Sequence, residues 1–353
     1  LGFSKFHLEQ YIEAARKIVD AVILSGEQPE AKRLEIPAER IYRENLRNDT
    51  KRPVQTGENG VFNFRDPRFG AYFADWKTVP TTGRYRMTFR VTGKDRFVYD
   101  QKYTGYYNAD PIRLDVHMGN RIHGFDLPDE KSTEILVDEW LAKDTRVILR
   151  QNTDAFALRG NGNFKFQQSI AYYHLKENDP KRYAQELKRI KKSGRKPQNP
   201  EAWHNWVEQW QGARPHLYNA VIEGPFYDSW PPKRQVALIG KNPKADSAAE
   251  ILLPIAERAF RRPIREGELD RFVTLVESKV KTLGDIEALK EGIVAILVSP
   301  QFLMLQNEDL TPEERFSSKL SYFFASTIPG SELQASVAAG ELNSFTAVRD
   351  YLK

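Results

Sequence analysis

The chain of 353 residues contains no cysteine. This absence excludes disulfide bonds, thiol nucleophiles and cysteine-ligated metal sites, and also the CxxCH motif that attaches c-type haem. It does not fix the compartment, because exported proteins need not contain disulfides. The sequence also lacks any run of about 18 apolar residues, so it predicts no membrane-spanning helix.

The common catalytic motifs are missing as well. The sequence has no GxSxG elbow, no P-loop and no GxGxxG run leading into a helix. Its acidic residues are too numerous to single out a glycosidase pair. The net charge of +5, from 53 basic and 48 acidic side chains, neither demands nor excludes an anionic partner. We therefore predict no catalytic residue, leave enzymatic activity open and expect no nucleic-acid partner.

Helical spacing dominates residues 245–353, which we predict to form an all-α domain. Thr311, Pro312 and Glu314 indicate a capped helix start, and Gly340 suits a left-handed helix exit. A second helix is expected to begin near Pro263, and a last one to cover 344–353. The expected buried stripes are Ile251, Ile255 and Ala259; Leu269, Phe272, Val276 and Val280; Ile286, Leu289, Ile293 and Ile296; and Phe316, Leu320 and Phe323.

Residues 33–225 change to a period of two. Short alternating runs separated by Gly, Pro, Asn and Asp are typical of an antiparallel β-sandwich or jelly roll. In the run from Gly83 to Gly93, alternate residues are apolar and polar, which indicates a strand with one wet face. The fold class predicted is therefore α+β multidomain, a jelly-roll-like sandwich followed by an all-α domain. The strand runs are RLEIPAERI, VFNFRD, GRYRMTFRVTG, PIRLDVHMG, RIHGFDLP, TEILVDEW, TRVILRQ and HLYNAVIEGP.

Two helical segments flank or interrupt this sandwich. Residues 1–27 predict an opening helix with Leu8 among its buried residues, and residues 178–212 predict a helical insertion that begins at Asp179-Pro180. The insertion has eight basic residues between Lys181 and Lys196, which form either a solvated face or an anion-binding surface. Its tryptophans are spaced as a buried stripe or a sugar platform, at Trp203, Trp206 and Trp210.

Several motifs carry a resemblance to a known group of proteins. They are Arg258-Ala259-Phe260-Arg261-Arg262-Pro263, Ser299-Pro300-Gln301-Phe302-Leu303, Lys319-Leu320-Ser321-Tyr322-Phe323-Phe324, Ser331-Glu332-Leu333 with Gly340, and upstream Glu223-Gly224-Pro225 with Trp230-Pro231-Pro232. In this order they resemble modules of the planctomycete cytochrome-associated multidomain proteins. We interpret Arg261 and Arg262 as structural residues that cap a helix and pair with acids.

The resemblance implies a large exported protein whose modules are mostly of unknown function. It implies a carbohydrate-binding-like sandwich between helical modules, with 1–27 ending a preceding module. It also implies that 245–353 holds two consecutive modules, the second truncated. A haem-binding cytochrome domain would lie elsewhere in the polypeptide. We accordingly expect the chain to be an internal or processed piece located in the periplasm or at the cell surface.

A ligand signal occurs in the predicted loop from Val98 to Asp110. A sugar site needs exposed aromatic rings beside polar groups, and this segment supplies both, so its aromatics either bind a glycan or pack a long loop. The candidate glycan-binding residues are Tyr103, Tyr106, Tyr107 and Asp110.

Metal signals are weaker. Calcium prefers six or more oxygen ligands, and Asp126, Asp129 and Asp154 are the candidates for Ca²⁺. His117 and His123 lie across an apparent hairpin with Asp115 and Asp126 near, and zinc could use two histidines and a carboxylate, although spacing does not establish the strand pairing that would bring them together.

Two function classes follow. The first is a non-catalytic segment that binds glycan or another surface polymer and holds neighbouring modules of the same polypeptide. The second is a structural part of an extracytoplasmic haem-containing oxidoreductase, with protein partners in that compartment and its haem outside this chain.

Overall fold

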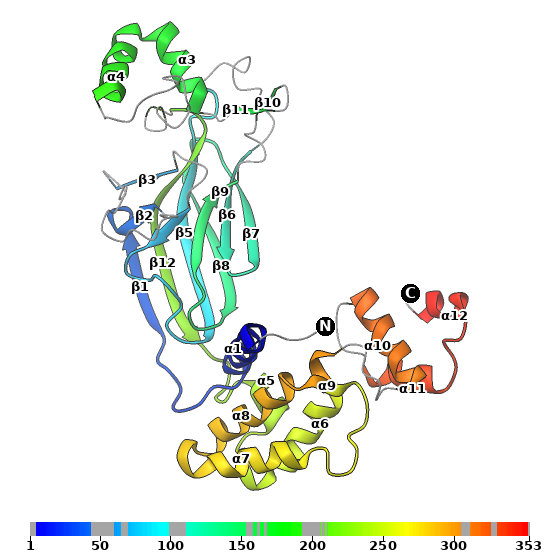
Figure 1. The fold of residues 1–353 in the computed structure, drawn as a ribbon. Coiled ribbons are helices and arrows are strands. Elements are labelled where there is room, and N and C mark those ends of the chain that lie inside the picture. The colour runs from blue at the N-terminus through cyan, green and yellow to red at the C-terminus, as the bar shows by residue number, and fades with distance from the viewer. Residues whose placement is uncertain are drawn as a thin grey trace. The chain divides into compact units, whose positions relative to one another are not determined.

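The computed structural model describes residues 5–43, 60–64, 70–98, 111–152, 158–160, 163–165, 168–192, 206, 209, 211–304, 311–325 and 330–351. The chain divides into two compact units, one covering Pro29–Phe226 and the other combining Leu1–Gln28 with Tyr227–Lys353. The first unit contains antiparallel sheets and the second is helical, which confirms the predicted α+β class (Figure 1). In the part of the chain described, no helix is both long enough and apolar enough to cross a bilayer.

Ten strands of the first unit build two sheets, here called sheet A and sheet B. Sheet A contains, in spatial order, β1 (Lys32–Pro37), β12 (Arg214–Phe226), β5 (Gly83–Lys94) and β8 (Thr133–Leu141), with β3 (Phe62–Asn63) beside β12. Sheet B contains β2 (Ile41–Arg43), β4 (Ala71–Phe73), β9 (Val147–Gln151), β6 (Ile112–Met118) and β7 (Arg121–Leu127).

The strand order is that of a jelly roll. When β1, β4, β5, β6, β7, β8, β9 and β12 are numbered one to eight along the chain, sheet A reads 1-8-3-6 and sheet B reads 2-7-4-5. First therefore pairs with last, second with seventh, third with sixth and fourth with fifth, all antiparallel. This nested pairing is one long hairpin folded over into two sheets, and it confirms the jelly-roll prediction.

Alternation along the strands explains the core between the sheets. In β5, Tyr85, Met87, Phe89 and Val91 are buried and the residues between them face outward, as predicted. The Tyr85 hydroxyl is satisfied by donating to the Thr81 carbonyl oxygen at 2.9 Å, a tyrosine-corner arrangement. One predicted strand is split, because a 3-10 turn at Ala38–Arg40 carries the chain from sheet A to sheet B.

Helices interrupt the sandwich between β9 and β12. A short hairpin of β10 (Leu158–Gly160) and β11 (Asn163–Lys165) precedes α3 (Gln168–Asn178) and α4 (Pro180–Lys192). Asp179 caps α4 as predicted, since its carboxylate accepts a hydrogen bond from the Arg182 amide at 3.0 Å. Trp206 is fully buried between Tyr172 and Tyr183, so this tryptophan is core; Trp203 and Trp210 lie outside the described residues.

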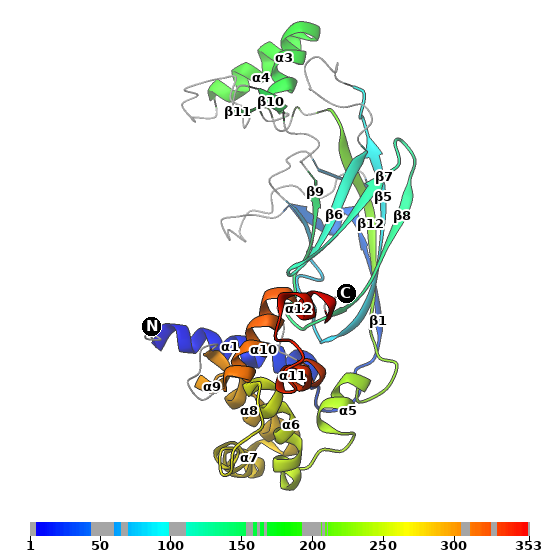
Figure 2. The ribbon, with the colours of Figure 1, turned by 90° about the vertical axis from the view of Figure 1, so that its right-hand side faces the viewer.

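The helical unit is built around α6, α7 and α8 (Figure 2). Gly292 of α8 permits their close approach, because a Cβ there would stand 2.6 Å from Cγ2 of Val276 on α7. The helices are α1 (Lys5–Val22), α5 (Lys233–Ile239), α6 (Ala248–Phe260), α7 (Asp270–Leu283), α8 (Asp285–Leu297), α9 (Pro300–Leu303), α10 (Pro312–Ala325), α11 (Ser331–Ala338) and α12 (Phe345–Tyr351).

Several helix predictions are confirmed and three are wrong. The capping box exists, with Thr311 and Glu314 exchanging hydrogen bonds at 2.9 and 3.2 Å. However, Phe323 is 81% exposed and Phe316 41% exposed, so these two rings do not form the buried face of α10. That helix instead buries serines, at Ser317, Ser318 and Ser321.

The other two errors are smaller. α7 begins at Asp270 rather than near Pro263, because an ion pair from Arg262 to Glu268 holds the intervening residues as a turn. In α1, Leu8 is 42% exposed, and burial is confined to the later turns around Ala15 and Val19.

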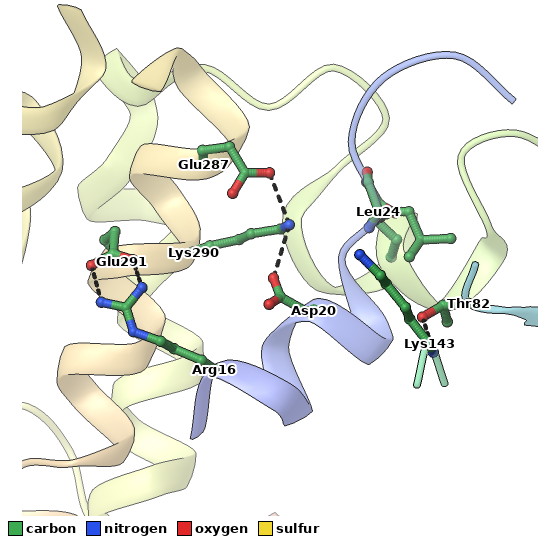
Figure 3. A network of polar contacts seen from close by, with 9 residues as sticks. Arg16, Asp20, Leu24, Thr82, Lys143, Glu287, Lys290 and Glu291 are labelled. Carbon is green, nitrogen blue, oxygen red and sulfur yellow. Dashed lines mark hydrogen bonds and ion pairs between the residues drawn. The ribbon is translucent and has the colours of Figure 1, made fainter. Parts of the chain in front are cut away.

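The opening helix α1 packs on α8 (Figure 3). Arg16 makes two hydrogen bonds to Glu291, at 2.5 and 2.9 Å. The ammonium of Lys290, whose side chain is only 10% exposed, lies 3.1 Å from Asp20 and 2.9 Å from Glu287. Opposite charges on the two helices therefore flank the apolar contact and fix how α1 lies on α8.

Candidate functional site

The outward face of sheet B carries an unusual row of apolar side chains. Tyr42 pairs with Tyr72 across β2 and β4, and their ring centroids are 5.9 Å apart. The ladders continue the row, because Ile148 pairs with His117 and His117 pairs with Ile122. We call Tyr42, Tyr72, Ile148, His117 and Ile122 the aromatic row. It crosses all five strands, about 19 Å at the usual strand spacing.

Tyr72 and Ile148 are neighbours because Ala71, one residue before Tyr72, pairs with Leu149. The close approach of β4 to β9 requires glycine next to the row. A Cβ at Gly70 would lie 2.3 Å from Cγ2 of Ile148 and 2.9 Å from the carbonyl oxygen of Leu149. Residues of the row are half-buried or exposed, with Ile122 59% exposed, so their apolar surface faces outward.

A polar row runs beside the aromatic row on the same face. Arg150 pairs with Asp115 across β9 and β6, and Arg113 pairs with Asp126 across β6 and β7. Asn152 donates from Nδ2 to Asp115 at 3.0 Å. The Arg113 Nε donates to Asp126 at 2.7 Å, and this bond and the carboxylate charge raise the pKa of Arg113. The polar row thus presents both donors and acceptors, and its two arginines balance its two aspartates.

This combination suits a polyol. Aromatic faces and aliphatic side chains match the apolar faces of sugar rings, and guanidinium, amide and carboxylate groups match hydroxyl edges. The analysis of the sequence missed Tyr42 and Tyr72, because their strands are three residues long and show no periodicity. Only the strand register brings the two tyrosines together. The one available signal was that each tyrosine lies next to an apolar residue that is buried, Ile41 before Tyr42 and Ala71 and Phe73 around Tyr72.

The predicted tyrosine-rich segment lies in the sequence between β5 and β6. Tyr103, Tyr106, Tyr107 and Asp110 lie outside the described residues. Three ion pairs lie at the end of β5. They join Lys94 to Glu130, Arg96 to Asp129 and Arg214 to Asp95. The hydrogen bond from Lys94, followed by that from the Asp95 amide, lowers the pKa of Glu130. The residues at the end of β5 are therefore held by the residues between β7 and β8 and by β12.

Two of the three calcium candidates form ion pairs with arginines. Asp126 pairs with Arg113, and Asp129 pairs with Arg96, whereas Asp154 lies outside the described residues. In the parts of the chain that the structure describes, no three His, Asp or Glu side chains are arranged to hold a metal ion.

The histidine pair suggested by the sequence does not form a site. His123 pairs with Val116, and His117 pairs with Ile122, so the two imidazoles point to opposite faces of sheet B. His123 instead lies 3.0 Å from Glu139 of β8. The zinc hypothesis for these two histidines is therefore wrong.

The predictions that Arg261 lies at a helix end and that Arg262 pairs with an acid are confirmed. Arg261 ends α6 with a left-handed φ of 64°, is 1% exposed and donates from Nη2 to the Phe302 carbonyl at 2.5 Å. Arg262 donates to Glu268 at 2.8 and 2.6 Å. Both guanidiniums are buried and hydrogen-bonded to internal partners, so neither one is available as an anion site.

The fold defines a two-part molecule, a β jelly roll combined with a helical unit. Comparison with protein families gives one match: residues 247–307 match the family model described as PSD5, protein of unknown function (DUF1595). The matched residues include α6, α7, α8 and α9. The helical unit therefore contains a domain of unknown function. A comparison with curated proteins gave no match.

Proposed function

We propose that the chain is a non-catalytic, polysaccharide-binding and scaffolding segment of a larger exported protein. The observation that carries this proposal is the aromatic row on sheet B, with a polar row of donors and acceptors alongside it. A face about 19 Å long accommodates consecutive sugar rings of a chain rather than a single sugar. The tyrosine-rich segment around Tyr103, Tyr106 and Tyr107, with Asp110, adds a second set of contacts in this proposal.

The scaffolding part rests on the helical unit. Its matched family has no assigned function, and the buried roles of Arg261 and Arg262 favour structural work. Two of the motifs that resemble planctomycete cytochrome-associated proteins, Arg258-Ala259-Phe260-Arg261-Arg262-Pro263 and Ser299-Pro300-Gln301-Phe302-Leu303, lie within the matched residues, which supports the same assignment. In this proposal the protein is exported, and any covalently attached c-type haem belongs to another module because the chain has no cysteine.

The test is binding of the full chain to a panel of immobilised polysaccharides. Tyr42→Ala and Tyr72→Ala should each weaken binding by about tenfold, because removing an aromatic stacking partner typically costs 0.5–1.5 kcal/mol and the lost contact area adds to it. Tyr218→Ala is the matched control, since Tyr218 is a half-buried tyrosine of sheet A that lies under Arg90. Equal binding by all three variants would refute the role of the aromatic row.

A separate experiment addresses the tyrosine-rich segment. Changing Tyr103, Tyr106 and Tyr107 together to Ala should reduce affinity further if the segment lies along the polymer, and should leave the melting temperature unchanged. Mass spectrometry of the native full-length polypeptide tests the remaining part. Covalent haem on a neighbouring module would support the cytochrome association, and a chain that carries no further module would contradict it.

A further inference from the structure

The outer face of α4 concentrates positive charge. Tyr183, Leu187 and Ile190 turn toward α3 and Trp206, and Ile190 is buried. The exposed side of the same helix, green in Figure 1, carries three lysines that we call the α4 lysine face. These are Lys181, Lys188 and Lys191. Their spacing of seven and then three residues places them on one side of a helix.

This helix holds a large share of the charge of the chain. Pro180–Lys192 contains six basic side chains and one acidic one, so its excess equals the net charge of +5 for all 353 residues. The single acid, Glu186, is engaged by Arg189 at 2.6 Å. The rest of the sequence therefore has equal numbers of basic and acidic side chains, and α4 carries the excess.

The needs of the helix itself do not explain the pattern. Cations near the C-terminus of a helix are favourable, which accounts for Lys188 and Lys191. Lys181 lies in the first turn, where the helix dipole disfavours a cation. The three lysines also repel one another at about 5–15 Å along the axis. An anionic partner along the face would remove both costs.

We propose that the α4 lysine face binds the carboxylate or sulfate groups of an acidic polysaccharide. This rests on the proposed function, which supplies a polymer, and it specifies the chemical class of that polymer. Charge complementarity selects the occupant: a row of exposed cations matches regularly spaced anions on an extended chain. The insertion leaves the sandwich from β9 and returns at β12, and Lys94 at the end of β5 pairs with Arg214 at that return. The return of the insertion to the sandwich and the end of β5 are therefore neighbours at one end of the jelly roll.

The experiment compares two triple variants of the full chain with the same loss of charge. Lys181→Gln/Lys188→Gln/Lys191→Gln removes the face, and Lys77→Gln/Lys131→Gln/Lys143→Gln removes three exposed lysines from sandwich loops. Affinity electrophoresis in gels containing polygalacturonate or heparin should show at least about tenfold weaker binding for the first variant only. The same measurement with an uncharged polysaccharide should show no difference between the two. Binding to the acidic gels should weaken as salt rises, because screening acts on exposed charges.

The outcomes separate the two proposals. Equal loss in both variants would mean that only net charge matters and would overturn the α4 site. Loss of binding to single-stranded DNA alone, with polysaccharide binding unchanged, would assign the face to nucleic acid and also overturn it. In a third outcome, Tyr42→Ala and Tyr72→Ala leave polysaccharide binding unchanged while the α4 triple variant no longer binds the acidic polysaccharide. That result would refute the binding role of the aromatic row and support that of the α4 lysine face.

Discussion

Arg262 and Glu268 form a two-bonded ion pair across the turn between α6 and α7, with N–O distances of 2.8 and 2.6 Å. The side chains are only 2% and 14% exposed. A further bond from Arg262 to the Pro263 carbonyl, at 2.9 Å, closes the turn around the arginine. The pair therefore sets where α6 ends and where α7 begins.

Arg262→Ala should destabilise the helical unit by about 3 kcal/mol, because it leaves Glu268 partly buried without its partner. Arg265→Ala is the control, since Arg265 is exposed on the same turn. Chemical denaturation measures both, and polysaccharide binding should not change in either variant. An Arg262→Ala protein of normal stability that has lost binding would make this turn a ligand site.

The same pair should give an acid-sensitive contribution to stability. The hydrogen bond from Arg262 lowers the pKa of Glu268 from its ordinary value of 4.5. A carboxylate with a lowered pKa in the folded state stabilises fully above its unfolded value, and this stability is lost as the pH falls through the folded value. The difference in unfolding free energy between the wild type and Glu268→Gln should be constant from pH 7 to about 5 and shrink below 4.5. A difference independent of pH would show that the charge of Glu268 does not matter.

Lys290 should control how firmly α1 is held. Lys290→Ala removes the cation between Asp20 and Glu287, so local opening of α1 should become easier by about 1–3 kcal/mol. Hydrogen exchange of the α1 amides measures this directly. Lys281→Ala on α7 should leave α1 exchange unchanged, because Lys281 is exposed on a different helix. Identical exchange in the two variants would mean that apolar packing alone holds α1.

Phe323 should contribute little to stability despite its size. Because Phe323 is 81% exposed, replacing it with Ser should change the unfolding free energy by no more than about 0.5 kcal/mol. Leu252 of α6 lies in the hydrophobic core of the helical unit, so Leu252→Ala serves as the comparison. We expect it to lower the unfolding free energy by about 2–5 kcal/mol. Calorimetric measurement of the unfolding free energy of the Phe323→Ser and Leu252→Ala variants checks both expectations. A large loss with Phe323→Ser would restore the original prediction that this ring is core.

Local patterns in the sequence predicted the strongly periodic parts. Residues of β5 alternate so regularly that both faces could be assigned, and the capping box at Thr311 is a short-range feature. The face of α10 could not be predicted in this way. Phe316 and Phe323 and the serines beside them give the helix two weakly different sides, and tertiary packing decides between them.

The candidate site depended on long-range register. Tyr42 and Tyr72 are 30 residues apart and meet only through pairing of β2 with β4, while Ile148 and His117 join from two further strands. Only the register separates the histidines, with His117 and His123 on opposite faces. Spacing alone cannot show which residues share a sheet face when the pairing is unknown.

The first and last strands of the jelly roll, β1 and β12, are paired from Lys32 to Pro37, so the two covalent connections to the helical unit leave from neighbouring positions at the end marked by Lys32 and Gly224. If the proposed polymer binding holds, a pull on the sandwich would be shared by two adjacent strands rather than carried by one. Such a load would act along β12 against its long ladder with β5 and would load many hydrogen bonds at once in shear.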